Sequence, residues 1–195
     1  EAAVGRAQQA LRGCPPSVGL LMPRGGAAIV ADLALAGLGR TIVPLPEFFS
    51  AEQLRHIVAD SGLEAVVAGP ETAEQAAMLA VPAIVLPDDI LSPCGSTGWP
   101  STEPPIAAGT CRRVIYTSGT TGRPKGVALD EAAMASTLGG LRRAVDASAA
   151  DLHLSVLPFA QLLEQLAGIL LPLSVGARIH VAAEPAELFR AAHAI

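Results

Sequence analysis

Charged and aromatic side chains are scarce in this 195-residue sequence, at 16% and 3%, whereas hydrophobic residues make up 51%. The low aromatic content, together with abundant alanine and leucine, favours helices packed on a buried sheet over a β-sandwich. The net charge of -5 argues against the basic patch that a general nucleic-acid-binding protein presents. We therefore expect an α/β protein without a nucleic-acid partner.

Cysteine is also rare, and the three cysteines, Cys14, Cys94 and Cys111, include no Cys-x-x-Cys pair. An odd number without paired spacing predicts reduced thiols rather than a disulfide framework. The four histidines are scattered, and none has a second ligand at metal-binding spacing on the same helix face. We therefore expect no structural metal.

The sequence lacks a hydrophobic run long enough to cross a membrane. Its longest apolar stretch, residues 25–39, is interrupted by Asp32 and is too short to span a bilayer. The first residues lack the basic-then-apolar order of a signal peptide. These absences lead us to expect a cytoplasmic protein with no transmembrane segment.

What the sequence does contain is an alternation of short apolar strands and helices. The pattern predicts strands at 17–22, 41–43, 65–68 and 83–86, and helices at 2–12, 26–38, 50–62 and 71–80. The best-marked helix begins at Ser50, where Ser-Ala-Glu-Gln forms a capping box, and ends at Gly62. Apolar strands joined by short helical crossovers are typical of a mostly parallel sheet flanked by helices on both faces.

Residues 87–111 break this alternation, because proline, glycine, serine and threonine dominate them. We predict a long surface connection with a short turn at 88–91. The alternation resumes afterwards, so we interpret residues 1–195 as a single domain interrupted by this connection. The later elements are predicted as strands at 113–116, 127–129, 152–157 and 177–181, and helices from Asp130, at 160–171 and at 184–195.

The clearest chemical signal is the segment 116–126, Tyr-Thr-Ser-Gly-Thr-Thr-Gly-Arg-Pro-Lys-Gly. Glycines let backbone N–H groups approach an anion, hydroxyls donate hydrogen bonds to phosphate oxygens, and Lys125 adds a positive charge. The spacing does not match a Walker A loop, in which lysine directly follows the second glycine and a helix begins. We therefore predict a phosphate-binding loop of another kind; the alternative is a flexible hairpin loop without a ligand.

In its order of residues this segment resembles the signature loop of the AMP-forming adenylate synthetase superfamily, which includes acyl-CoA synthetases, luciferases and peptide-synthetase adenylation domains. Flanking segments also resemble the family, in a style closest to long-chain fatty acyl-CoA ligases; they are 18–22, 41–45, 50–62, 154–164 and 172–179. The resemblance covers nearly the whole chain. It implies that residues 1–195 are a partial AMP-binding domain, the N-terminal subdomain of such an enzyme.

The resemblance also implies a reaction in two halves. A carboxylate attacks the α-phosphate of ATP-Mg²⁺ to give an acyl-adenylate and pyrophosphate, and a thiol, usually coenzyme A, then displaces AMP. Seven loop residues are implied to hold the β- and γ-phosphates: Thr117, Ser118, Gly119, Thr120, Thr121, Gly122 and Lys125. Lys125 is also the implied catalytic cation, whereas the magnesium ligand is expected outside this chain.

A second implied site lies after the loop, where the resemblance places Phe159 and Gln161 at the entrance for the acyl substrate. Packing at the start of a helix is the alternative for both residues. Gln161 stands where family members often carry histidine or an aromatic residue. Glu164 is expected to be an exposed helix carboxylate rather than a magnesium ligand.

Together these features predict the N-terminal, ATP-binding portion of an acyl-CoA ligase that converts a fatty acid, ATP and CoA to acyl-CoA, AMP and pyrophosphate. We expect this chain not to be competent alone, because the family's later motifs have no counterpart in it. The alternative is a truncated nucleotide-binding or interaction module without catalysis. An exposed edge where further chain would dock is also consistent with self-association into a homo-oligomer.

Overall fold

The computed structural model of this chain describes residues 2–91, 113–117 and 123–182. The chain divides into two compact units, Glu1–Glu131 and Ala132–Ile195. The helix predicted at 184–195 and most of the connection predicted at 87–111 lie outside the described residues. The single interrupted domain therefore stays a prediction.

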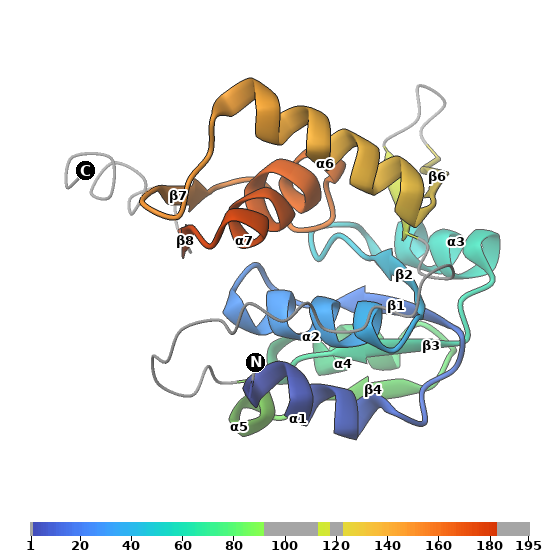
Figure 1. Ribbon diagram of the computed structural model, residues 1–195. Helices are drawn as coiled ribbons and strands as arrows, with labels where there is room; N and C mark the ends of the chain where they lie inside the picture. The colour runs from blue at the N-terminus through green and yellow to red at the C-terminus, as the bar shows by residue number, and fades with distance from the viewer. Residues whose placement is uncertain (1, 92–112, 118–122, 183–195) are drawn as a thin grey trace. The chain divides into compact units, whose positions relative to one another are not determined.

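The first unit is built around a six-stranded sheet with the order β4-β3-β1-β2-β5-β6 (Figure 1). The strands are β1 (Ser17–Leu21), β2 (Thr41–Pro44), β3 (Ala65–Ala68), β4 (Ala83–Val85), β5 (Arg113–Thr117) and β6 (Lys125–Leu129). The first five pair in parallel, and β6 pairs antiparallel with β5 at the edge of the sheet. The mostly parallel α/β sheet predicted from the sequence is confirmed.

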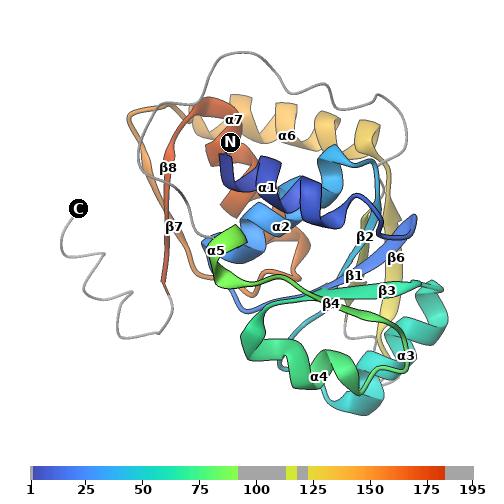
Figure 2. The same ribbon diagram turned by 90° about the horizontal axis from the view of Figure 1, so that it is seen from below.

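Helices cover both faces of this sheet. The helices are α1 (Ala2–Leu11), α2 (Gly26–Gly37), α3 (Ala51–Ser61), α4 (Ala73–Ala77) and α5 (Asp88–Leu91), with a 3₁₀ turn at Pro70–Thr72 before α4. α1, α2 and α5 contact one another on one face, whereas α3 and α4 lie on the other (Figure 2). This arrangement explains why the central strands are apolar along their whole length, since neither face meets water.

The core of the first unit fills the space between these layers. Every residue of β3 is buried, and a cluster of buried side chains from β1, β2, β3 and α3 extends to Tyr116 in β5. Packing is close enough at Gly19 that an added Cβ would lie 2.9 Å from a methyl of Leu45. The strands of the sheet are therefore fixed by apolar packing on both sides.

An ion pair inside the first unit joins α2 to the start of β5. The guanidinium of Arg113 donates from Nη1 to Oδ1 of Asp32 and from Nη2 to Oδ2, the second over 2.6 Å. Both residues are buried, at 2% and 1% exposure. A buried charge is tolerated when a partner and hydrogen bonds compensate it, and here each ion compensates the other.

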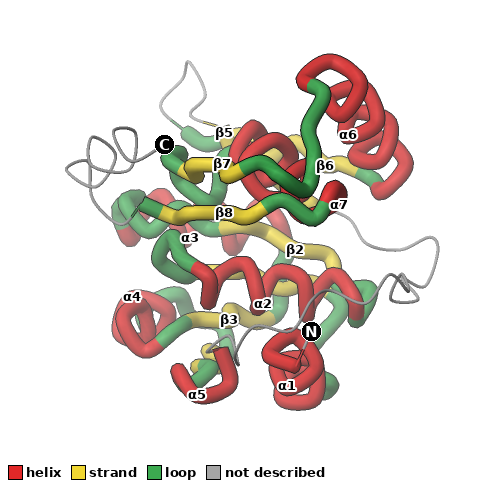
Figure 3. Tube along the Cα trace, turned by 60° about the vertical axis from the view of Figure 1, so that its left-hand side comes forward, coloured by secondary structure: helices red, strands yellow, loops and turns green. Residues whose placement is uncertain are grey.

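The second unit contains a smaller sheet and the helices around it. β7 (Leu152–Ser155) pairs in parallel with β8 (Arg178–Val181), and Figure 3 shows the two strands side by side. α6 (Glu131–Val145) precedes β7, and α7 (Leu171–Val175) precedes β8. The strands and the helix predicted from Asp130 are thus present in this unit.

The helix predicted at 160–171 has a different form from the one expected. Residues Glu164–Leu170 form a π-helix, here labelled η2, which runs directly into α7. An added Cβ at Gly168 would lie 2.5 Å from the carboxyl carbon of Glu164, so the Glu164 side chain folds over the space that Gly168 leaves. Apolar periodicity predicted a helix here but could not distinguish its winding.

Candidate functional site

The candidate site centres on the hairpin of β5 and β6. Five residue pairs join the two strands, from Arg113 opposite Leu129 to Thr117 opposite Lys125. The hairpin loop begins at the carboxyl end of β5, which runs parallel to β2. Ligands of α/β sheets bind outside the carboxyl ends of parallel strands, so the loop opens at the edge where a ligand is expected.

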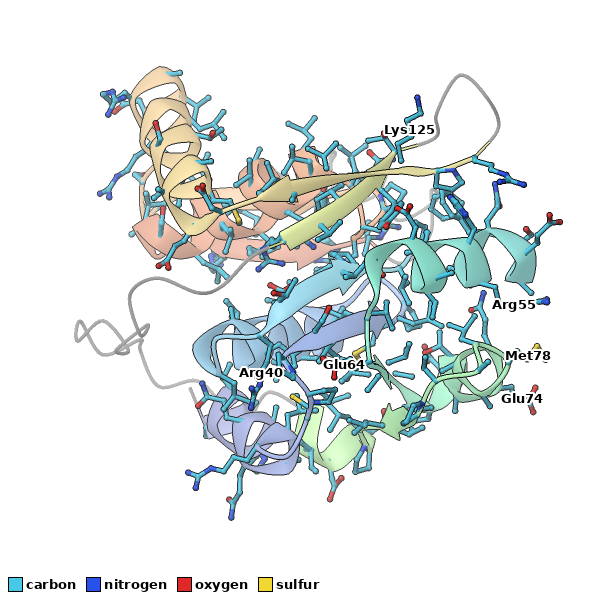
Figure 4. All side chains as sticks on the ribbon, turned by 90° about the vertical axis from the view of Figure 1, so that its right-hand side faces the viewer. Arg40, Arg55, Glu64, Glu74, Met78 and Lys125 are labelled. Atoms are coloured by element: carbon cyan, nitrogen blue, oxygen red, sulfur yellow. The ribbon has the colours of Figure 1, made fainter. Side chains whose placement is uncertain are left out.

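Two of the predicted phosphate-binding residues lie on the described strands. Thr117 and Lys125 are both exposed and face each other as the last residue pair before the loop. Figure 4 shows the Lys125 side chain projecting from the start of β6. Lys125 is also the only lysine in the sequence. At the described ends of its two strands, the hairpin therefore presents the Thr117 hydroxyl and the Lys125 ammonium group.

The other predicted phosphate-binding residues, Ser118, Gly119, Thr120, Thr121 and Gly122, lie outside the described residues. Their role stays a prediction. The two residues that follow them are described: Arg123 is exposed and Pro124 is buried.

A tyrosine and a glycine fit together below the mouth of the hairpin. Tyr116 is paired with Gly126, and an added Cβ at Gly126 would lie 2.9 Å from the ring of Tyr116 and 3.0 Å from a methyl of Val114. The Tyr116 hydroxyl donates to Oδ2 of Asp60 over 2.7 Å. Burial, and then the hydrogen bond to Asp60, raise the pKa of the Tyr116 phenol well above its ordinary value. The phenol is therefore held neutral as a donor.

Helix α3 supplies the partner groups for this hairpin. Ser50 and Gln53 form the predicted capping box at its start, and Gly62 ends it in the left-handed conformation. Leu54 and Ile57 anchor the helix in the core. These features fix both ends of α3 and bury its apolar face in the core.

The hairpin-facing side of α3 carries His56 and Asp60, one helical turn apart. The Nε2–H of His56 donates to the carbonyl oxygen of Pro124 over 3.2 Å, while Asp60 accepts from Tyr116. Sequence reasoning did not select either residue. Their four-residue spacing shows only that they share a face, and nothing in the sequence indicated that this face meets the hairpin.

A cavity of ≈ 630 Å³ lies between the start of α3 and the exit of the loop. Its lining includes the cationic residues Arg55 and Arg123, the carboxylate residue Glu52 and His56. Cations thus outnumber carboxylates in a space beside the loop. Such a lining suits part of an anionic ligand such as a polyphosphate.

The predicted substrate residues belong to the second unit. Phe159 is buried, with 7% exposure, and its carbonyl accepts a hydrogen bond from Nε2 of Gln165 over 2.7 Å. Gln161 is exposed, and its backbone N–H bonds to the Pro158 carbonyl over 3.0 Å. Both residues therefore lie at a turn before η2, and a role for either at an acyl entrance stays a prediction.

The expectation that Glu164 is an exposed helix carboxylate is wrong. Glu164 is 2% exposed and accepts hydrogen bonds from the hydroxyl of Ser155 and from the backbone N–H of Leu157. The η2 winding and the missing Cβ of Gly168 turn the side chain inward. Its carboxylate therefore fastens the end of β7 to η2.

Among the described residues, no group of three or more histidine, cysteine, aspartate or glutamate side chains is arranged to bind a metal ion. Cys14 is buried with a free thiol. Over the part of the chain that the structure describes, no helix is both long and apolar enough to cross a membrane.

Comparison with known families gives one match that covers almost the whole chain. The model of the family described as AMP-binding enzyme matches residues 9–195. The match contains both the hairpin and the segment around Phe159.

Curated relatives include two synthetases. FR901469 synthetase of Dothideomycetidae sp. (strain 11243) is 35% identical over 146 residues, which cover 73% of this chain and 1% of that protein. Phosphinothricin tripeptide synthetase of Streptomyces viridochromogenes is 33% identical over 145 residues, 73% of this chain and 13% of that protein. The chain thus spans only a small part of these relatives.

Solved structures with the same fold include ligases. A malonyl-CoA ligase with methylmalonyl-CoA and AMP bound is 29% identical, with a TM-score of 0.71, over 94% of this chain and 37% of that one. The o-succinylbenzoate CoA synthetase of Bacillus subtilis, in complex with an acyl-adenylate intermediate, has a TM-score of 0.79 at 18% identity. The match covers 99% of this chain and 51% of that one, and at this identity it supports only the fold.

Proposed function

The chain belongs to the AMP-binding enzyme family, and from this premise we propose that it is the ATP-binding portion of an enzyme that activates a carboxylic acid as its adenylate. The observation that carries the proposal is the mouth of the β5–β6 hairpin. There Thr117 and Lys125 face each other at the carboxyl end of β5, beside a cavity lined by Arg55 and Arg123.

The proposed reaction transfers an adenylyl group. An oxygen of the substrate carboxylate attacks the α-phosphorus of ATP, the bond to the bridging oxygen breaks, and pyrophosphate leaves with the electron pair. Negative charge increases on the leaving pyrophosphate, so cations and donors near the β- and γ-phosphates lower the barrier. We assign this role to Lys125 and Thr117, and to the loop residues Ser118, Gly119, Thr120, Thr121 and Gly122.

The second proposed step transfers the acyl group from the adenylate to a thiol and releases AMP. A thiolate sulfur attacks the acyl carbonyl, and the carbon–oxygen bond to AMP breaks, which gives a thioester. We propose CoA as the thiol and a fatty acid as the acid, supported by the resemblance of 154–164 to fatty acyl-CoA ligases. The synthetase relatives support the coarser class equally well.

Magnesium is the ion that would accompany ATP in this reaction. The described residues around the hairpin offer cationic and hydroxyl groups that fit a polyphosphate, and the carboxylates of Asp60 and Asp32 already accept hydrogen bonds from Tyr116 and Arg113. We therefore propose that the ion is held by residues other than these. We also propose that this chain alone binds ATP and does not turn it over.

The single lysine allows a direct test of ATP binding. An amine-reactive reagent modifies one lysine in this protein, and peptide mapping separates Lys125 from the N-terminal amine. We expect ATP-Mg²⁺ to slow modification of Lys125 and to leave the N-terminal amine unaffected, because the phosphates cover only the hairpin mouth. Equal rates at Lys125 with and without ATP-Mg²⁺ would contradict the proposal.

Calorimetry supplies the second arm of this test. We expect heat of binding from the unmodified chain with ATP-Mg²⁺ and a weaker signal from Lys125→Ala. Arg142→Ala is the matched control, since Arg142 is an exposed cation in the last turn of α6. If Arg142→Ala weakens binding as much as Lys125→Ala does, the effect is one of net charge and the assignment of Lys125 is wrong.

A further inference from the structure

The described part of the hairpin touches α3 on both sides of the loop, and this double contact has no role in the reaction as proposed above. On the entering strand, Tyr116 donates to Asp60. On the leaving side, the Pro124 carbonyl accepts from His56. The two α3 residues are four positions apart, so one helix face meets both ends of the loop.

We propose that His56 and Asp60 are positioning residues that clamp the two ends of the phosphate-binding hairpin to α3. We call the four residues Tyr116, Pro124, His56 and Asp60 the α3 clamp. The inference rests on the proposed function only for the identity of the ligand, ATP. The clamp itself is a set of contacts within the first unit.

Helix α3 is well defined along its length. Its capping box and its left-handed Gly62 fix its two ends, and its buried Leu54 and Ile57 pack into the core of the first unit. A helix held in this way is a stable support. The hairpin, by contrast, forms the edge of the sheet, and four of the five residues of β6 are exposed. Figure 1 shows α3 beside β6, and the two elements are in contact.

The two hairpin residues that contact α3 are both buried. Tyr116 is buried and lies against Gly126, where no side chain larger than hydrogen fits under the ring. Pro124 is buried and has no N–H of its own, so its carbonyl is the backbone group that the hairpin offers to α3. His56 reaches that carbonyl from the cavity lining.

The clamp residues adjoin the phosphate-binding candidates in the chain. Thr117 directly follows Tyr116, and Lys125 directly follows Pro124. The clamp therefore holds the residue immediately before each of the two described phosphate-binding candidates. Preorganised donors stabilise a ligand more than mobile ones, because they lose less freedom when it binds.

The experiment compares ATP-Mg²⁺ binding by calorimetry in the unmodified chain, Tyr116→Phe, His56→Ala and His56→Gln. Tyr116→Phe removes only the hydroxyl, and His56→Gln retains a side-chain N–H donor. We expect Tyr116→Phe and His56→Ala to weaken binding by about three- to tenfold each, the size of one hydrogen bond. His56→Gln should recover part of the loss. Glu64→Ala, an exposed carboxylate just after α3, is the control and should bind as the unmodified chain does.

Amide hydrogen exchange gives a readout that does not depend on ATP. Opening of the clamp should speed exchange in residues 125–129 of β6 and leave β1 unchanged, whereas general destabilisation would speed both. If the unmodified chain binds no ATP, the proposed function fails, and amide hydrogen exchange in β6 alone tests whether the clamp holds the hairpin. Unaltered β6 exchange in both Tyr116→Phe and His56→Ala, or unaltered ATP affinity in a chain that binds ATP, would overturn the clamp.

Discussion

The buried ion pair between Asp32 and Arg113 allows a quantitative prediction about stability. Asp32→Asn keeps the size of the side chain but removes its charge and one acceptor oxygen. In the native protein both side chains are nearly sealed from water, at 2% and 3% exposure, and each guanidinium nitrogen of the pair meets its own carboxylate oxygen. The asparagine amide would therefore point a donor at a donor, beside a buried cation that has lost the Asp32 carboxylate.

The expected cost is large because the buried Arg113 guanidinium loses the carboxylate charge of Asp32. Breaking a buried pair in this way typically costs about 3 to 5 kcal/mol, a substantial part of the total stability of about 5 to 15 kcal/mol of a typical domain. With a urea dependence of about 1 to 3 kcal/mol per molar, the unfolding midpoint should fall by roughly 1 to 5 M. Circular dichroism against urea concentration measures this shift.

The matched control is Glu64→Gln, the same exchange of carboxylate for amide at an exposed position labelled in Figure 4. It should change stability by less than about 0.5 kcal/mol. A double variant, Asp32→Leu with Arg113→Met, removes both charges and should be more stable than Asp32→Asn. A midpoint for Asp32→Asn equal to that of Glu64→Gln would refute the reasoning that this pair is a buried, mutually dependent unit.

Three further predictions concern the hairpin and η2. Tyr116 is the only tyrosine, so the ultraviolet absorbance of its phenolate reports one group; ionisation in the folded chain should occur well above the ordinary pH of about 10, because its pKa is raised. The protonated Tyr116 phenol thus contributes its full stability below about pH 10, and this contribution is lost as pH rises further. Tyr116→Phe should abolish that alkaline loss of stability. Ionisation of Tyr116 at the ordinary pH in the folded chain would contradict the raised pKa. Gly126→Ala should cost about 1 to 3 kcal/mol in a urea titration, because the new methyl meets the Tyr116 ring; an unchanged midpoint would show that the ring moves freely. Gly168→Ala should cost a similar amount, since it displaces the Glu164 carboxylate. The control Gly140→Ala in α6, with open space around it, should stabilise by about 0.5 to 1 kcal/mol. Equal effects of these two variants would show that Glu164 does not depend on the missing Cβ of Gly168.

Local sequence signals predicted most of the fold because they depend on a few adjacent residues. The capping box at Ser50 and the glycine at position 62 bound α3 as expected. The apolar runs of β1 and β3 mark strands that are buried on both faces, and both were predicted within one residue. The π-helical winding of η2 was not predictable, since it depends on how Glu164 packs over Gly168 and reaches β7.

The candidate site was likewise predictable only in part from the sequence. The order of residues in 116–126 was enough to predict a phosphate-binding loop and to suggest the family, because the chemistry of the loop lies in consecutive residues. Lys125 and Thr117 lie at the mouth of that loop. Glu164 was misjudged because burial of a carboxylate depends on hydrogen-bond partners, Ser155 and Leu157, that a helical pattern does not reveal.

The sequence by itself thus determined the α/β alternation, the ends of α3 and the chemical character of the hairpin loop, since each is written in neighbouring residues. Only the tertiary structure decided what surrounds the loop. It brings His56 and Asp60 against Pro124 and Tyr116, at separations of 68 and 56 residues in the chain. Such contacts depend on the order of strands in the sheet and on which face each helix covers, and no local pattern encodes them.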